Sequence, residues 1–358
     1  MDPLTHTLVG ASLAQTRVAR GPLATATCLM GANLPDIDAA TYFLEGDIAL
    51  GVRRGWTHGI LAMAILPAVL TWIMLQIDRI RCERDPIATP IPVGRFAGLA
   101  YLSTLSHPAL DWLNTYGVRL LMPFESRWFY GDTLFIVDPW LWLILGTVAL
   151  MAHSHSRPLI VGWIALGVIA VNLVTGVAGV PLPLRALWCL GLSLVIGIRI
   201  RRRGAPPVPW LASCCLVLAT SYIVAMITSS QFVEQQVTEW AQARGLKPTH
   251  IMVIPAPADP FRRTVLLADE QHYHRFTFDW LAAERISPTG RHIDIGNDHP
   301  AATAALASPD AWGLATWTRF PTFQVESLED GHRVTIGDVR FGRTVVELDS
   351  QLRVQHRK

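Results

Sequence analysis

The chain has 358 residues, of which 51% are hydrophobic and 16% are charged. An average soluble domain carries about 25% charged residues, so this composition excludes a chain that is surrounded by water throughout its length. The 30 Lys and Arg residues nearly balance the 28 Asp and Glu residues, which excludes a general electrostatic attraction to nucleic acid.

Apolar segments at the beginning of the chain predict membrane helices. Residues 4–16 and 22–32 are shorter than the roughly 20 residues that a spanning helix needs, so they are expected to pack inside a bundle or to form a re-entrant pair. Residues 59–77 carry no charge and predict a complete span. Further spans are expected at residues 97–121, 136–152, 158–178, 184–198 and 208–228. The sequence therefore predicts an all-α polytopic membrane domain at residues 1–230, a helical bundle of about six or seven spans.

Arginines in two connecting loops predict the orientation of this domain. An even number of expected spans separates the loop at 79–95 from the loop at 199–203, so both loops can lie on the cytoplasmic face, as the positive-inside rule requires. One more crossing at 208–228 then leaves everything after Ser230 on the extracytoplasmic face. The arginines concerned are Arg79, Arg81, Arg84, Arg95, Arg199, Arg201, Arg202 and Arg203.

Residues 231–358 have a mixed polar composition with many turn-forming residues. Short alternating runs at 263–267, 332–336 and 343–348 indicate strands, and residues 231–244 indicate an opening helix. This part is expected to be a soluble, strand-rich α+β domain. His272 and His274 stand out in it, but surface packing explains them as well as a contact with substrate does.

His107 and Asp111 are the most informative polar residues of the expected spans, because ionisable groups in a membrane are costly and usually functional. They stand four apart in S-H-P-A-L-D-W-L-N, which puts them on one face of a helix, and Asn114 follows about one turn later. A hydrogen bond that joins two helices explains this pair as readily as a ligand role does.

A second polar cluster precedes the span at 59–77. Asp36 and Asp38 lie in N-L-P-D-I-D, and R-R-G-W-T-H contains Arg53 and Arg54 and ends at His58. Taken singly, the two aspartates are explained by a turn or a helix cap and the two arginines by anchoring at the membrane interface. His6, taken singly, is explained as an exposed histidine near the N-terminus.

The combination of these histidines and aspartates indicates a metal site. Imidazole nitrogens and carboxylate oxygens are the ligands that suit zinc or a similar divalent ion, and one Asp can bridge two ions. A bound ion would also explain why charged groups are retained in this environment. With a water on an open coordination position, such a site would support hydrolysis.

The sequence resembles the LexA-regulated, membrane-bound predicted metal-dependent hydrolase family over about residues 1–200. The matching motifs are D-P-L-T-H-x-x-x-G from Asp2, N-x-P-D-x-D from Asn33, R-G-x-T-H from Arg54, H-x-x-x-D-x-x-N-T-Y-G from His107 and G-D-x-x-F-I-V-D-P from Gly131. The resemblance implies a metal-dependent hydrolase in a bacterial inner membrane. It does not imply a particular substrate.

The order of the candidate ligands is also similar to that of the helical zinc-dependent phospholipase C and single-strand nuclease group. This similarity implies that His6, Asp36, His58, His107 and Asp111 are metal ligands, with Asp111 as the bridging carboxylate. No matching H and H-x-x-x-E set follows Asp111, which favours one or two ions over three. Asp38, Asp132 and Asp138 are possible replacements, although Asp132 and Asp138 are equally explained as turn residues beside a span.

These observations lead to the expectation of a hydrolase that cleaves a phosphoester of a lipid or another amphiphile. Arg53 or Arg54 would hold the anionic group together with Asn114, and Asp38 or Asp138 would act as general base. The expected partners are membrane lipids and the substrate, without nucleic acid, and no oligomeric state is predicted. Two alternatives stay open: a metal or proton transporter that uses the same His and Asp residues, and a non-catalytic membrane scaffold.

Overall fold

The computed structural model describes residues 1–19, 21–44, 48–202, 209–340 and 343–354. The chain divides into two compact units. The first comprises Met1–Asp36, Thr57–Phe232 and Ile254–Arg263, and the second comprises Ile37–Trp56, Val233–Val253 and Thr264–Lys358. Each unit consists of three separate segments, and the predicted domain boundary after residue 230 stays a prediction. Arg203 of the second basic loop and the C-terminal Lys358 lie outside the described residues.

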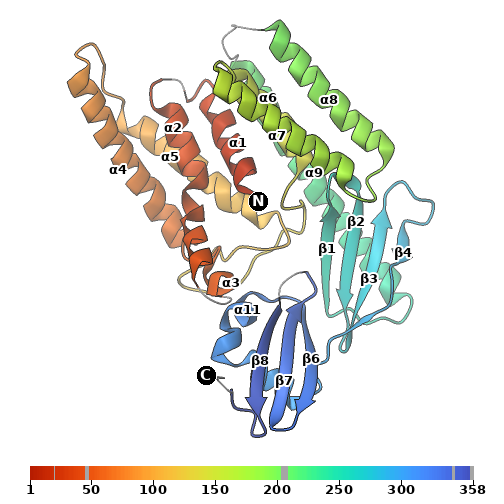
Figure 1. Ribbon diagram of the computed structural model, residues 1–358. Helices are drawn as coiled ribbons and strands as arrows, with labels where there is room; N and C mark the ends of the chain where they lie inside the picture. Colours follow the sequence, from red (N-terminus) through yellow and green to blue (C-terminus); the bar gives the residue numbers. More distant parts are fainter. Residues whose placement is uncertain (20, 45–47, 203–208, 341–342, 355–358) are drawn as a thin grey trace. The chain divides into compact units, whose positions relative to one another are not determined.

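The first unit begins with two short helices that pack on a longer one, α5 (Figure 1). α1 spans Pro3–Ala14, α2 spans Ala24–Asn33 and α5 spans Val93–Trp112. Asp2 caps α1, because its carboxylate accepts a hydrogen bond from the backbone N–H of Thr5 at 3.0 Å. The short apolar segments at 4–16 and 22–32 are therefore helices whose small residues, such as Ala11 and Ala32, are buried.

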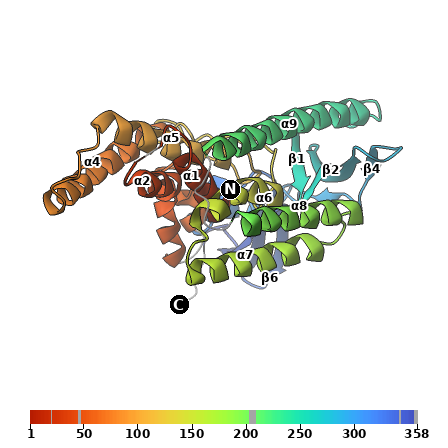
Figure 2. The same cartoon turned by 90° about the horizontal axis from the view of Figure 1, so that it is seen from above.

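Four described helices are long and apolar enough to cross a membrane. They are α4 (Ile60–Arg84), α7 (Arg157–Gly176), α8 (Leu182–Arg201) and α9 (Pro209–Gln242). α6 (Pro139–His153) is apolar but has only 15 residues. α7 and α8 contact each other and run side by side (Figure 2). The membrane helices are confirmed, whereas the predicted number of six or seven spans is not.

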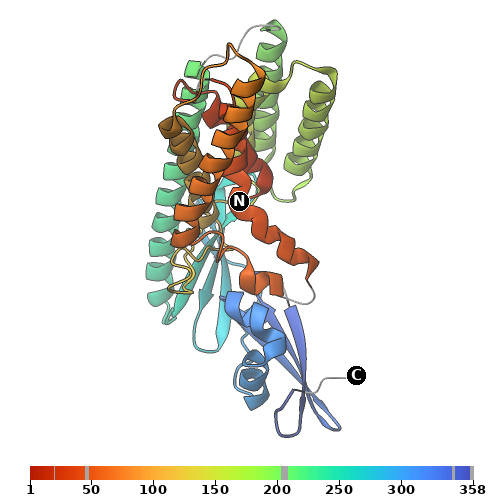
Figure 3. The same cartoon turned by 90° about the vertical axis from the view of Figure 1, so that its left-hand side faces the viewer.

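Two predicted helix boundaries need correction. The span expected at 97–121 is wrong beyond Trp112, where α5 ends and the chain turns. The turn is stabilised by the Asn114 side chain, which accepts the backbone N–H of Tyr116 at 2.8 Å, and by Gly117, whose φ is +85°. Conversely, the span at 208–228 and the helix at 231–244 form one continuous helix of 34 residues, α9 (Figure 3).

The end of α9 contributes to the apolar core of the second unit. Val233, Val237 and Ala241 pack there against strand residues that include Val265 and Phe276. The first sheet has the strand order β1-β2-β3-β4, and β5 pairs with β3. Its strands are β1 (His250–Ala256), β2 (Asp259–Ala268), β3 (His272–Asp279), β4 (Ile286–Pro288) and β5 (Ile293–Asp294).

The second sheet of this unit is a three-stranded antiparallel meander with helices against it. The short helix α3 packs on α11, and Gly51 lies so close to the Trp312 ring that a Cβ atom would approach it to 2.4 Å. The elements are α3 (Ile48–Val52), α10 (Pro300–Leu306), η2 (Pro309–Ala311), α11 (Trp312–Trp317), β6 (Pro321–Leu328), β7 (Gly331–Asp338) and β8 (Arg343–Asp349). The 3-10 helix η1 (Leu34–Phe43) begins in the first unit and continues into the second after Asp36. The expectation of a strand-rich C-terminal domain is confirmed.

Candidate metal centre

α5 positions His107 and Asp111 one helical turn apart on a fully buried face. The Nδ1 atom of His107 lies 2.7 Å from the backbone carbonyl oxygen of Ala32 on α2. Because a carbonyl oxygen only accepts hydrogen bonds, Nδ1 carries a proton, so in the neutral ring the lone pair is on Nε2. This Nε2 atom faces the carboxylates of Asp111 at 3.5 Å and Asp36 at 3.7 Å.

His6 reaches the same place from α1. Its ring stacks on the ring of His107, with the centroids 3.6 Å apart and the planes 14° from parallel. Its Nε2 atom lies 3.3 Å from Oδ1 of Asp111. The first helix therefore contributes a buried imidazole to the carboxylate on α5.

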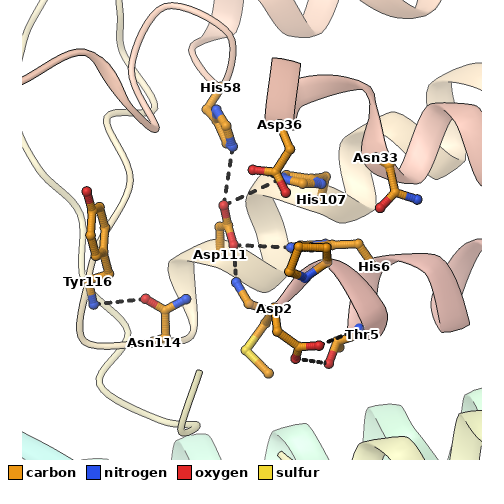
Figure 4. A network of polar contacts seen from close by, with 12 residues as sticks. Asp2, Thr5, His6, Asn33, Asp36, His58, His107, Asp111, Asn114 and Tyr116 are labelled. Atoms are coloured by element: carbon orange, nitrogen blue, oxygen red, sulfur yellow. Dashed lines mark hydrogen bonds and ion pairs between the residues drawn. The ribbon is translucent and has the colours of Figure 1, made fainter. Parts of the chain in front are cut away.

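His58 and Asp36 complete the cluster (Figure 4). His58 lies just before α4, and its Nε2 atom is 3.2 Å from Oδ2 of Asp111, while Thr57 Oγ1 lies 2.9 Å from its Nδ1 atom. Asp36 lies in η1 and has 17% of its side chain exposed, whereas the other four members are buried. The ligand atoms form two sets within which all lie no more than 4.8 Å apart: His6, His107 and Asp111, and Asp36, His58 and His107.

The chemistry of this cluster fits a divalent metal ion. Both ring nitrogens of His6 and the Nε2 atom of His107 are buried and make no hydrogen bond among the described residues. The carboxylate oxygens that face the two Nε2 atoms are 3.3 to 3.7 Å away, beyond the usual range of about 2.7–3.2 Å. Buried nitrogens without hydrogen bonds are costly, and coordination to an ion would use their lone pairs.

The amino group of Met1 also contributes to the cluster, and it affects the argument that the Asp111 carboxylate needs a bound cation as its counter-charge. The α-ammonium group of Met1 is buried and contacts Oδ1 of Asp111. Asp111 therefore has a cationic neighbour in addition to the histidines, and its need for a counter-charge does not by itself require a metal. The support for an ion comes from the imidazole nitrogens instead.

Asp38, Arg53 and Arg54 belong to the second unit and form a local cluster there. Asp38 accepts the backbone N–H of Arg54 at 2.8 Å, and its other oxygen lies 3.5 Å from Nε of Arg53. The Arg53 guanidinium lies over the ring of Tyr42 at 4.6 Å. These contacts hold Arg54 at a φ of +52°, which is unusual for a residue with a side chain. Their roles as general base and anion-binding residues stay predictions.

Asp132 and Asp138 occupy structural positions of the kind that a turn residue takes. Asp138 caps α6 by accepting the N–H groups of Trp140 at 2.9 Å and Leu141 at 3.0 Å, and it also accepts the hydroxyl of Tyr222 at 3.0 Å. Asp132 has a φ of +48°, and its carbonyl oxygen accepts the hydroxyl of Ser230 at 2.9 Å. Among the described residues, neither Asp132 nor Asp138 is part of a group of side chains that could hold a metal ion.

Three contributors to the cluster were missed from the sequence. Thr57 is part of the R-G-x-T-H motif, so its position beside His58 was a usable signal. The carbonyl of Ala32 and the ammonium group of Met1 are backbone groups that come close only through folding. No residue pattern identifies them in advance.

The comparison with known protein families gives a match for the first half of the chain. Residues 1–179 match the family described as YdjM inner membrane protein. This range contains all five candidate ligands, and the described helices that are long enough for a membrane agree with the family's location. No curated protein and no solved structure matches the chain significantly. The chain belongs to the YdjM inner membrane protein family.

Proposed function

We propose that this protein is a membrane-bound, metal-dependent hydrolase that binds one or two divalent ions, zinc being the best fit, and cleaves a phosphoester of a lipid or another amphiphile. The observation that carries the proposal is the convergence of His6, His58 and His107 on the two carboxylates of Asp36 and Asp111 in a buried site. Three imidazoles around two carboxylates form a donor set of the zinc type.

The contacts of Asp111 support its role as the shared ligand. Its Oδ1 atom faces His6 at 3.3 Å, and its Oδ2 atom faces His58 at 3.2 Å and His107 at 3.5 Å. The two oxygens are thus directed at different histidines, which is the arrangement that a carboxylate between two ions requires. When bound, a divalent ion supplies Lewis-acid chemistry and makes water a nucleophile at neutral pH.

The location of the site supports an amphiphilic substrate. The ligands come from α1, α5 and the segments around α2 and α4 of an inner membrane protein, so a substrate that reaches them from the bilayer must be compatible with lipid. Asp36 is the partly exposed member, and we assign the approach of the scissile group to its side of the cluster. Arg53, Arg54 and Asn114 are proposed to hold the anionic group, and Asp38 or Asp138 to act as general base.

The experiment combines metal analysis, hydrolysis and transport in the purified full-length chain. Asp111→Asn keeps the volume of the side chain but removes its charge. We expect the variant to lose bound metal. Its hydrolysis of a phosphodiester amphiphile should fall by more than about 10–100-fold, which is the loss typical of removing a group that only supports a ligand. Chelator should abolish the activity of the parent, and vesicles that contain the parent should show no zinc flux.

Asp78→Asn is the matched control. Asp78 is also a buried carboxylate of a membrane helix, but it accepts the N–H of Ile91 at 2.7 Å and pairs with Arg81. Its variant should keep the metal of the parent, provided that thermal unfolding shows a folded protein. Bound metal with zinc flux and no hydrolysis would favour a transporter, and a parent without metal would favour the non-catalytic scaffold.

A further inference from the structure

A second group of metal-ligand residues lies on the first sheet of the second unit. β3 and β5 pair antiparallel, with His272 opposite Asp294 and Tyr273 opposite Ile293. Side chains alternate between the two faces of a strand, so His274 shares the face of His272, and His292 shares the face of Asp294. Directly opposed and diagonal neighbours on one face are within reach of each other. The register therefore gathers His-x-His and His-x-Asp on one surface.

The distances agree with this register. Nε2 of His272 lies 3.4 Å from Oδ1 of Asp294, and Nε2 of His292 lies 3.6 Å from the same oxygen. The rings of His272 and His292 meet edge to face with centroids 4.5 Å apart. Zinc bonds of about 2.0–2.2 Å in a tetrahedral site separate neighbouring ligand atoms by about 3.3 Å. The observed separations are close to that value.

Asp269 supports the cluster from the turn between β2 and β3. Its Oδ1 atom accepts the backbone N–H groups of Gln271 at 2.9 Å and His272 at 2.7 Å, and its Oδ2 atom lies 2.6 Å from Nε2 of His274. Nδ1 of His272 lies 3.7 Å from Oδ1 of the same carboxylate. Asp269 thus fixes the backbone at His272 through its N–H group and places a negative charge 3.7 Å from the His272 ring, which favours a bound cation.

We propose that His272, His292 and Asp294 form a surface site for a divalent transition ion that prefers imidazole ligands, such as Zn²⁺, with Asp269 and His274 as positioning residues. The alternative is an ordinary ion pair on the surface. An ion pair needs only one histidine beside the Asp294 carboxylate, whereas His272 and His292 both face the same oxygen of Asp294. The side chains of His272, His292 and Asp294 are 34%, 55% and 79% exposed, so water can complete the coordination. This site does not depend on the proposed function.

The test is a calorimetric titration of Zn²⁺ into the full-length chain, compared with a variant that combines His272→Ala and His292→Ala. Both histidines are partly exposed, so the variant should fold. We expect it to lose one Zn²⁺-binding phase of the parent. Asp269→Asn should weaken the same phase about fivefold, because it removes a negative charge 3.7 Å from the His272 ring. His250→Ala, which changes an exposed histidine outside the cluster, should bind Zn²⁺ like the parent.

The outcomes separate the two metal sites of the chain. If the double variant binds as many ions as the parent with the same affinities, the surface site is wrong whatever the fate of the buried one. If Asp111→Asn removes a phase and the double variant removes a different one, both sites are supported. The Zn²⁺-binding phase assigned to His272 and His292 should survive in Asp111→Asn. If it does, and if neither the parent nor any variant hydrolyses the phosphodiester, this inference is supported and the proposed function is contradicted.

Discussion

His107 illustrates how a single backbone contact can prepare a side chain for coordination. Its Nδ1 atom is committed to the Ala32 carbonyl at 2.7 Å, so its Nε2 atom is the one directed at Asp36 and Asp111. A carbonyl partner of this kind also fixes the tautomer of metal-binding histidines in general. The orientation of the ring therefore depends on α2, although the ligand itself belongs to α5.

Asp38 and Asp138 are aspartates whose contacts a purely structural role would also explain. Both were candidates for general base, and both accept backbone N–H groups at 3.0 Å or less. Such contacts fit a turn and a helix cap, the alternative that the sequence pattern leaves open, and the general-base role stays a prediction. Short-range patterns cannot separate a capping aspartate from a catalytic one, because both occur at the same local positions.

Asp338 provides a prediction about pH. It is buried at the end of β7, pairs with Arg340 at 2.8 Å and accepts the N–H groups of Arg319 at 2.8 Å and Phe320 at 3.0 Å. Burial raises the pKa of this carboxyl, but the pairing with Arg340 and the backbone N–H groups outweigh burial, so the pKa lies below its ordinary value. The folded state therefore binds the proton more weakly than the unfolded state. This stabilisation is present above about pH 4 and is lost as the pH falls through the folded-state pKa.

We expect Asp338→Asn to destabilise β6, β7 and β8 by about 3 kcal/mol or more at neutral pH, because Arg340 is left buried without its charged partner. The difference between parent and variant should shrink as the pH falls below about 4. Hydrogen exchange of peptides from residues 321–338 in the full-length chain measures this locally. Glu326→Gln is the control, since its exposed pairing with Arg333 at 3.7 Å should contribute less than about 1 kcal/mol. A constant difference from pH 7 to pH 3 would contradict the assignment.

At the scale of elements, the site depends on the close approach of α1 and α2. Gly10 stands one turn after His6 on α1, and a Cβ atom at this position would lie 2.6 Å from the Cys28 carbonyl and 2.9 Å from the Cβ of Ala32. Real Cβ atoms do not approach backbone so closely, so any side chain at position 10 must push the two helices apart. Ala32 is also the residue whose carbonyl orients His107.

We therefore expect Gly10→Ala to cost about 1–3 kcal/mol of stability and to weaken metal binding at the buried site. The physical reason is that α2 would shift and carry the Ala32 carbonyl away from His107. The measurements are thermal unfolding and the metal content of the purified protein. Gly98→Ala is the control, because nothing lies within 4 Å of a Cβ atom there and alanine favours a helix. Equal metal binding by both variants would show that this helix contact does not position the ligands.

At the scale of the whole molecule, the orientation in the membrane is still a prediction. The arginine-rich loops at 79–95 and 199–203 are expected in the cytoplasm, and the chain after Ser230 is expected on the other side. A membrane-impermeant maleimide should label Ser327→Cys in intact cells, because Ser327 is exposed on β6. The native Cys82 at the end of α4 should react only after the membrane is opened. The reverse pattern would mean that the orientation is wrong.

The sequence alone determined the properties that depend on local composition. The length of an apolar run and its freedom from charge decide whether a segment suits a membrane, so α4, α7, α8 and α9 were predictable as helices. The same holds for the strands at 263–267, 332–336 and 343–348, whose alternating pattern is local. The pairing of His107 with Asp111 followed from helical periodicity. The full set of candidate ligands followed from short motifs that resemble those of known families.

Tertiary structure decided what depends on contacts between distant segments. His6, Asp36 and His58 converge on α5 because α1 and α2 pack against it, and no local pattern contains that packing. The end of α5 at Trp112 depends on the turn that follows, and the Met1 contact with Asp111 joins groups that are far apart in the chain. The surface cluster around Asp294 depends on strand register, since a shift of one residue would turn His292 to the opposite face. A sequence records which side chains are available, and only the packing of helices and the pairing of strands bring their ligand atoms together.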